Sequence, residues 1–499
     1  MADFDLAIIG GGINGAGIAR DAAGRGLRVL LVEQGDLASG TSSASSKLIH
    51  GGLRYLEQME FRLVREALDE REVLLRIAPH VVQPMRFVLP PQAGLRSPWL
   101  LRFGLFLYDH LGRRRLLPST RTLNFTDHPL AKPLRHRYRR GFEYSDCKVD
   151  DARLVILNAL DAAERGAVIR THTKFISAER SDVWTLILSV HGRRDVATAL
   201  ALVNAAGPWV TPVGANVAGP PTHGSRVRLD AGSHIVVPKL FDHDRGYILQ
   251  VEDGRVVFAL PYEQDFTLIG TTDRGFAGDP ATVHPSDAEI GYLCNVSNEY
   301  FRRQIKPGDV VWSYAGIRAL YDDGADKAQE LTRDYHLELD DRPDVPPLLT
   351  VIGGKITTYR RLAEEALAQL AWVIPMGRPW TATTPLPGGA FAFDGLSKEV
   401  KRALDRWPFL PEALIRRLLR AYGLRIERII GDARSLADLG PVFGADLTAA
   451  EVRYLMRHEW AQSEDDVLWR RSKLGLHVTS EQRAALGRFM ADDIGNAGV

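Results

Sequence analysis

The segment Gly40–Glu57, "GTSSASSKLIHGGLRYLE", gathers residue types that could bind a phosphate-bearing ligand. Five of the six residues from 41 to 46 carry hydroxyl groups, and Gly51 and Gly52 follow a few positions later. A glycine pair argues against a plain helix, because each glycine costs roughly 1 kcal/mol relative to alanine in a helix interior. Hydroxyls can bond phosphate or sugar oxygens, and glycine, which lacks a Cβ, lets backbone approach a flat ring. We expect Arg54 and Tyr55 to lie beside that ring, where a substrate would bind.

A second phosphate-binding pattern opens the chain, in "FDLAIIGGGINGAGIARDAAGRGLRVLLVEQG". It predicts a strand over Leu6–Ile9, a helix over Ile13–Arg25 and a second strand over Leu27–Val32. Gly10, Gly12 and Gly15 form the G-x-G-x-x-G turn between the first strand and the helix, a turn whose backbone and helix N-terminus bind a pyrophosphate. Glu33 lies about 20 residues further on, where an acidic residue accepts from a ribose hydroxyl. The unit therefore predicts a dinucleotide site.

Two later segments have similar strand-turn patterns, "ALVNAAGPWV" at 201–210 and "LLTVIGGKITTYRRLAEEAL" at 348–367. The Gly353–Gly354 turn taken alone is also typical of an ordinary strand-to-helix connection. The chain has no second G-x-G-x-x-G unit for a separate nicotinamide cofactor. Three separated segments around one dinucleotide are the arrangement with which flavoenzymes hold FAD in extended form, so we predict FAD as the cofactor.

The remaining pattern predicts three domains in an α/β fold. We assign 1–80, 145–225 and 345–376 to a Rossmann-like FAD-binding domain and 390–499 to a C-terminal all-helical domain. An inserted antiparallel-sheet domain, 81–144 and 226–344, would bind and cap the substrate. The two cysteines, Cys147 and Cys294, have no metal-ligand spacing, so no metal site is predicted. The N-terminus lacks the basic region of a signal peptide, and no apolar run approaches the ~20 residues of a spanning helix.

Eight motifs together carry a family resemblance over essentially the whole chain: "IIGGGINGAGIARDAAGRGL", "TSSASSKLIHGGLRYLE", "FEYSDCKVDDARLV", "LVNAAGPWV", "GSHIVVP", "IGTTD", "YAGIRAL" and "GGKITTYR". They resemble the aerobic, FAD-dependent glycerol-3-phosphate dehydrogenases, within the wider glycine-oxidase-like flavoproteins. The resemblance implies oxidation of sn-glycerol 3-phosphate to dihydroxyacetone phosphate, with electrons passed to a membrane quinone. It also implies a homodimer on the cytoplasmic, inner face of the cell membrane.

The resemblance and the residue chemistry together give the candidate site. A phosphate dianion needs convergent cations, and the hydroxyl being oxidised needs a base that titrates near neutrality. His234 is the predicted base, with His50 as a weaker alternative. The predicted catalytic residues are His234, Arg318 and Lys355, and the predicted substrate-binding residues are Arg54, Tyr55, Thr271, Asp273 and Arg333. The predicted cofactor-binding residues are Gly10, Gly12, Asn14, Gly15, Glu33, Thr41, Ser42, Ser45, Ser46, His50, Gly51, Gly52, Ala206, Gly207, Gly353, Gly354 and Thr357.

A basic and aromatic region, Arg96–Arg140, allows two interpretations. It carries a local charge of +9 in a chain of net charge +1, around the apolar run Trp99–Tyr108. It could be a buried helix with solvated arginines, or an interfacial patch whose apolar side chains enter lipid while Arg113–Arg115 meet anionic headgroups. The family resemblance favours the anionic lipid surface.

Three alternatives for the activity remain open from the sequence. A glycerol-3-phosphate oxidase that uses O₂ would share the fold, although we see no insertion of the kind expected for it. A related FAD-dependent amine or hydroxy-acid oxidase would share the fold as well. A nucleic-acid-binding flavoprotein is not favoured, because the aromatic residues form an apolar run rather than stacking positions among lysines.

Overall fold

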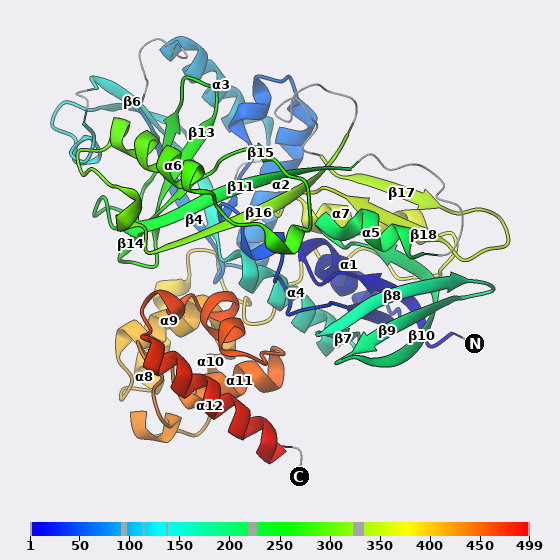
Figure 1. Cartoon of the computed structure of the whole chain (residues 1–499). Helices are drawn as coiled ribbons and strands as arrows, with labels where there is room; N and C mark the ends of the chain where they lie inside the picture. Colours follow the sequence, from blue (N-terminus) through cyan, green and yellow to red (C-terminus); the bar gives the residue numbers. More distant parts are fainter. Residues whose placement is uncertain are drawn as a thin grey trace.

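The computed structural model describes residues 2–90, 97–112, 115–135, 138–217, 227–322 and 334–497. Two mixed sheets form the body of the molecule, and a bundle of helices from the last hundred residues packs beneath them (Figure 1). The predicted residues Arg113, Arg114 and Arg333 lie outside the described ranges.

The first sheet is built on the N-terminal βαβ unit. β1 (Phe4–Ile9) pairs in parallel with β2 (Val29–Val32) and β10 (Arg193–Asn204), and β10 pairs in parallel with β18 (Leu348–Ile352). The edges are β7 (Val168–Arg170), parallel to β2, and β17 (His336–Asp340), antiparallel to β18. Helices cover one face: α1 (Ile13–Gly24), α4 (Asp151–Glu164) and α7 (Tyr359–Leu370). The hairpin of β8 (Thr173–Arg180) and β9 (Trp184–Val190) continues from β10 and covers the other face, and α5 (Val210–Ala215) follows β10.

The buried strands of this sheet explain the continuous apolar runs of the sequence. Every residue from Leu6 to Ile9 and from Val29 to Val32 is buried, as expected for parallel strands covered on both faces. The carboxyl ends of β1, β10 and β18 therefore meet at one edge, where the turns that follow them come together.

The second sheet is mostly antiparallel and long-stranded. Its central order is β11 (Val227–Pro238), β14 (Phe266–Gly270), β13 (Val256–Tyr262), β12 (Gly246–Gln250), β4 (Val82–Leu89) and β6 (Arg140–Val149). β16 (Trp312–Tyr321) pairs with β11, and short strands complete the edges: β3 (Leu48–Ile49), β5 (Arg121–Asn124) and β15 (Arg274–Gly275). The helices of this part are α2 (Phe61–Ile77), α3 (Pro98–Leu111) and α6 (Asp287–Tyr300).

Sheet membership departs from the predicted domain ranges in two places. β17 pairs with β18 in the first sheet, although 226–344 was assigned to the cap domain, because its antiparallel turn with β18 was not recognised in the sequence. β3 and the end of β6 belong to the second sheet, although 1–80 and 145–225 were assigned to the FAD-binding domain.

The C-terminal helices have their own apolar core. They are α8 (Leu396–Arg406), α9 (Glu412–Tyr422), α10 (Ile426–Ile430), α11 (Ala449–His458) and α12 (Ser480–Ala497), with a π-helical turn over Asp466–Arg471. Buried ion pairs join this bundle to the first domain. Arg471 pairs with Asp36, and Arg153 of α4 pairs with Glu459 where neither side chain is exposed. Removing one partner of such a pair leaves a buried, uncompensated charge, so these pairs hold the bundle in one place.

Helix α3 combines features of the two interpretations of the basic region. Its inner face, with Leu101, Leu105 and Tyr108, is buried against the second sheet. Its outer face exposes Trp99, Leu100, Phe103 and Phe106 to solvent. The helix is thus both a core helix and an exposed apolar surface, at the opposite end of the molecule from the C-terminal bundle (Figure 1). None of the helices in the described ranges is long and apolar enough to cross a membrane.

Candidate active site

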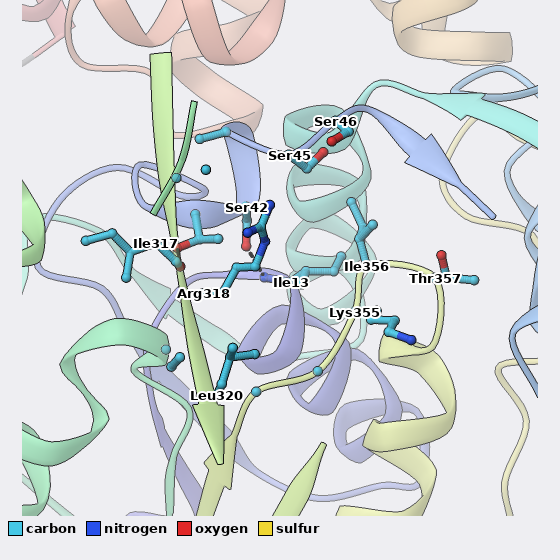
Figure 2. A pocket seen from close by; sticks show the side chains of 18 of the residues that line it. Ile13, Ser42, Ser45, Ser46, Ile317, Arg318, Leu320, Lys355, Ile356 and Thr357 are labelled. Atoms are coloured by element: carbon cyan, nitrogen blue, oxygen red, sulfur yellow. Dashed lines mark hydrogen bonds between the residues drawn. The ribbon is translucent and has the colours of Figure 1, made fainter. Parts of the chain in front are cut away.

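A cavity of about 1590 Å³ lies between the two sheets, at the edge where β1, β10 and β18 end. The turns that follow these three strands all line it, as do the Ser-rich segment and residues of β11 and β16. Figure 2 shows part of this wall, with Arg318 on β16 and with Lys355, Ile356 and Thr357 on the loop that leads into α7. Segments more than 300 residues apart in the sequence therefore form one site.

Close backbone packing requires glycine at two positions of the first turn, Gly10 and Gly15. Gly10 has a φ of +114°, and a Cβ there would lie 2.5 Å from the carbonyl oxygen of Ala205. A Cβ on Gly15 would lie 2.0 Å from the carbonyl oxygen of Gly10. β1, β10 and α1 can approach this closely only because these positions lack side chains, so the N-terminus of α1 faces the cavity.

Glu33 lies at the edge of the cavity, as predicted, and two backbone amides orient it. The Gly11 N–H donates to Oε2 at 2.7 Å and the Gly35 N–H donates to Oε1 at 2.9 Å. Burial raises the pKa of Glu33, and these amide bonds oppose the rise. A carboxylate held in this way retains lone pairs that can accept from a ribose.

The hydroxyls of the Ser-rich segment line the cavity, but they are also bonded within the protein. The Thr41 hydroxyl donates to the Ile317 carbonyl at 2.5 Å, and Ser42 Oγ accepts from the Ile13 N–H at 3.0 Å (Figure 2). The Ser45 hydroxyl donates to Asp151 at 2.7 Å, and Ser46 Oγ lies 2.9 Å from His234 Nε2. Their predicted contacts with a cofactor stay a prediction, because each hydroxyl already has a structural partner.

The glycine pair has a structural cause that differs from the expected one. A Cβ on Gly51 would lie 2.5 Å from Leu68 and 2.7 Å from the Tyr108 hydroxyl, which accepts a hydrogen bond from the Gly51 N–H. Gly52 has a φ of +74°, and its Cβ would meet the Tyr55 ring at 2.1 Å. Packing against the chain's own side chains thus requires both glycines. Gly52 lines the cavity, whereas Gly51 is not among the lining residues.

His234 lies on β11 in the cavity wall and is 2% exposed. Its ring stacks on Tyr314 of β16 at 4.9 Å between centroids, and a Cβ on Gly270 would collide with it at 2.1 Å. Nδ1 is buried with no hydrogen-bond partner among the described residues. Burial, together with the nearby cations Lys47 and Arg318, lowers the pKa of His234 to about 3. The imidazole is therefore neutral at physiological pH, and its pKa lies below the near-neutral value expected of the predicted base, because the ring is buried beside two cations.

The alternative base, His50, is held differently. Its backbone N–H donates to Thr357 Oγ1 at 3.3 Å, and burial with Lys355 and Arg71 lowers the pKa of its ring to about 4. Its role is to join the Ser-rich segment to the turn before α7, which agrees with its assignment to the cofactor segment.

Arg318 is held by two carboxylates before any substrate binds. Nη1 donates to Asp230 at 2.9 Å and to Asp273 at 2.5 Å, and Nη2 lies 3.4 Å from Thr271 Oγ1. A Cβ on Gly232 would collide with Arg318 and Thr271, so this glycine of the "GSHIVVP" motif leaves room for them. The structure therefore brings the predicted residues Thr271, Asp273 and Arg318 together beside His234.

A second cationic group lies on the wall formed by the Ser-rich segment and the turn before α7. Lys355 Nζ lies 3.8 Å from the centre of the Tyr55 ring, and Arg54 precedes Tyr55 in a short 3₁₀ helix. All three line the cavity. Two half-buried cations on one wall suit a dianionic phosphate, whereas Asp230 and Asp273 already balance the charge of Arg318.

Most of the predicted site residues line this one cavity. Gly15 and Gly51 are behind the wall, and Arg333 falls outside the described ranges. Sequence reasoning missed Tyr314, Lys47, Asp151 and Asp230, which hold the predicted residues in place. Lys47 directly follows Ser46, and Asp230 and Tyr314 lie four residues before His234 and Arg318, but their spacing does not indicate which side chain each one holds.

The cavity fits a dinucleotide by its own chemistry. Besides the α1 N-terminus and Glu33, Asn14 presents Oδ1, which is buried and has no partner among the described residues, while its Nδ2 donates to the Gly353 carbonyl at 3.0 Å. An orphaned buried acceptor costs about 1–3 kcal/mol unless something donates to it. The N–H-rich end of the cavity thus suits a pyrophosphate, and the end near His234 and Lys355 suits a redox-active ring and a substrate.

Comparison with known proteins agrees with this site. Residues 5–360 match the family described as "FAD dependent oxidoreductase", and residues 379–492 match the "C-terminal domain of alpha-glycerophosphate oxidase". The chain therefore belongs to the FAD-dependent oxidoreductases, and FAD is its cofactor, as predicted.

The relatives are more specific. The chain is 52% identical to glycerol-3-phosphate dehydrogenase of Pseudomonas aeruginosa over 98% of this chain and 95% of that one. It is 48% identical to aerobic glycerol-3-phosphate dehydrogenase of Escherichia coli, over 99% of this chain and 98% of that one. It is 50% identical to D-erythritol 1-phosphate dehydrogenase of Brucella abortus, over 96% of each chain. The structure of Bacillus halodurans glycerol-3-phosphate dehydrogenase complexed with FAD matches with a TM-score of 0.79 and 27% identity, covering 99% of this chain and 91% of that one. The family resemblance stated from the motifs is confirmed.

Proposed function

We propose that this enzyme oxidises the secondary hydroxyl of sn-glycerol 3-phosphate to give dihydroxyacetone phosphate. The observation that supports this most directly is that one cavity brings together a buried, neutral histidine, one of whose nitrogens has no partner within the described part of the chain, and the cations Arg54 and Lys355. The names of the relatives at 48–52% identity support the substrate.

FAD, when bound, supplies the acceptor for the hydride that leaves the carbinol carbon. Arg54 and Lys355 bind the phosphate, and Tyr55 holds the Lys355 ammonium over its ring face. His234 bonds Ser46 Oγ through Nε2 and lies in the cavity wall, where it is placed to take up the hydroxyl proton. Arg318, fixed by Asp230 and Asp273, directs N–H groups toward the oxygen that becomes a carbonyl.

A second substrate has specific support. A relative with 50% identity is named for D-erythritol 1-phosphate, which also carries a phosphate and a neighbouring polyol chain. Anaerobic addition of each compound to the purified holoenzyme distinguishes the two. We expect sn-glycerol 3-phosphate to bleach the flavin spectrum rapidly and at lower concentration. Faster bleaching by D-erythritol 1-phosphate would reassign the substrate, and bleaching by neither would refute the proposal.

The proposed electron acceptor is a membrane quinone, and the support is an apolar surface at the cavity opening. We call Met59, Phe61, Trp99, Leu100, Phe103 and Phe106 the α3 patch. All six are exposed, and four of them also line the cavity: Met59, Phe61, Leu100 and Phe103. Exposed apolar patches of this kind mark lipid or partner contacts, and the exposed cations Arg62 and Arg102 beside it suit an anionic surface.

We propose that the enzyme docks on the inner face of the cell membrane, where a quinone could reach the flavin from the lipid, and the α3 patch supports this proposal. A homodimer stays a proposal that rests on the family resemblance. Reoxidation of the reduced enzyme separates the acceptors: we expect a soluble quinone analogue to restore the flavin spectrum much faster than air does. Faster reoxidation by O₂ would favour an oxidase.

A further inference from the structure

Four aromatic rings form a continuous stack from the C-terminal bundle to the cavity. Trp469, in the π-helical turn, stacks on Trp312 of β16 at 4.6 Å and 25°. Trp312 contacts Tyr314 at 4.9 Å and 43°, and Tyr314 stacks on His234 at 4.9 Å and 13°. These four residues are called the aromatic stack below. It links two parts of the chain that no predicted role connects.

The outer end of the stack is firmly fixed. Arg471, two residues after Trp469, is buried and donates to both oxygens of Asp36, at 2.5 and 2.8 Å. Lys473 donates to the Trp469 carbonyl. A Cβ on Gly475 would lie 2.6 Å from the Trp469 ring, so the chain folds tightly over its other side. Trp469 is therefore held by the same turn that anchors the bundle to the first domain.

The inner end of the stack controls the histidine. The Tyr314 hydroxyl donates to the Ser45 carbonyl at 2.9 Å, and the neighbouring Ser46 bonds His234 Nε2. Lys47 Nζ lies 4.9 Å from the centre of the Tyr314 ring. Only one protein hydrogen bond fixes the imidazole, since Nδ1 has no partner among the described residues. The Tyr314 ring, together with the close packing of Gly270, supplies the rest of its orientation.

We infer that the C-terminal bundle takes part in catalysis: Trp469 is a positioning residue that holds the imidazole of His234, through Trp312 and Tyr314, in the orientation that proton transfer requires. This inference rests on the proposed role of His234 as the base. Aromatic pairs each contribute about 0.5–1.5 kcal/mol beyond the area they bury. A base displaced by about 1 Å loses up to a hundredfold in rate.

The test uses the full-length holoenzyme and the variant Trp469→Leu. We expect flavin reduction at saturating sn-glycerol 3-phosphate to slow about tenfold, while KM and FAD content stay within about twofold of the parent. Trp469→Phe, which keeps a ring, should restore most of the rate. The control is Phe489→Leu, which removes a ring from another aromatic pair of the same bundle, Phe443 with Phe489 at 4.8 Å, outside the stack. It should reduce flavin at the parent rate.

A second measurement reads the histidine directly. In protein labelled with ¹³C at the histidine ring, the His234 resonance, assigned from a His234→Gln variant, should shift in Trp469→Leu and in Trp312→Leu but not in Phe489→Leu. An unchanged rate and resonance in Trp469→Leu would overturn the inference, as would equal slowing by Phe489→Leu. If the parent enzyme itself is not reduced by sn-glycerol 3-phosphate, the proposed function fails. The resonance then still decides whether the stack orients His234.

Discussion

The α3 patch gives the most direct test of the proposed membrane docking. Trp99 and Phe106 are 81% and 55% exposed, and neither lines the cavity. Together they present the surface of about 1.4 fully exposed side chains, and burying one large apolar side chain contributes about 1.5–3 kcal/mol. Replacing both by serine should therefore cost about 2–4 kcal/mol of membrane affinity, or roughly 30- to 800-fold in the partition coefficient.

The assay is co-sedimentation with vesicles that contain anionic lipid. Each exposed cation near the surface adds about 1 kcal/mol, so part of the binding should weaken as salt rises, and the apolar part should leave a salt-resistant remainder. In the double variant this salt-resistant binding should weaken by roughly 30- to 800-fold, as calculated above. Its reduction of a soluble artificial acceptor should persist, because the cavity residues are unchanged, and its reduction of a quinone in vesicles should fall.

A matched control comes from the other end of the molecule. Leu436 and Val442, in the C-terminal bundle, are 42% and 50% exposed, so their replacement by serine also removes exposed apolar surface. This control should sediment like the parent. If the α3 variant sediments like the parent as well, or if both variants lose binding equally, α3 is not the docking surface.

The remaining predictions concern substrate, stability and pH. Lys355→Met should lower kcat/KM by a factor that corresponds to a loss of about 2–4 kcal/mol in transition-state stabilisation, with normal FAD content. Arg62→Ala, which removes an exposed cation, should leave kcat/KM unchanged. Equal losses in the two variants would show that Lys355 does not bind the phosphate. Glu459→Gln should lower the urea-measured free energy of unfolding by about 3–5 kcal/mol because it leaves Arg153 buried and unpaired, and Glu412→Gln, in an exposed pair, by at most about 1 kcal/mol. Burial lowers the pKa of His80 in the folded protein to about 3. As the pH falls below about 6.5, the unfolded chain therefore binds a proton at this histidine while the folded chain does not, and the free energy of unfolding decreases. Between pH 6.5 and 4, His80→Gln should therefore reduce the slope of the free energy of unfolding against pH by about 1.4 kcal/mol per pH unit. An unchanged slope would contradict this prediction.

The sequence predicted the parts of the site whose signals are local. Gly10, Gly15 and Glu33 keep fixed spacings within one βαβ unit, and the structure places them as the spacing requires. The aromatic stack and the anchors of the C-terminal bundle had no such signal. Asp36 and Arg471 are 435 residues apart, and nothing in either neighbourhood indicates a partner. Contacts of this kind depend on how the domains pack, which no single-sequence pattern reports.

The Ser-rich segment lies in the cavity wall, as its residue types predicted, but its hydroxyls also have a structural use that the sequence did not indicate. Its hydroxyls suggested a ligand, and the segment does line the cavity. Yet four of its five hydroxyls each join a different element: Thr41 binds β16, Ser42 binds α1, Ser45 binds Asp151 at the start of α4, and Ser46 binds His234 on β11. The fifth, on Ser43, donates to the Gly40 carbonyl within the segment. Short hydroxyl side chains suit this junction, because they satisfy carbonyl, amide, carboxylate and imidazole partners without filling the cavity between them. The same chemistry that would bind a pyrophosphate thus builds the wall around it, and a serine there carries out both tasks only where its second lone pair or its proton remains free.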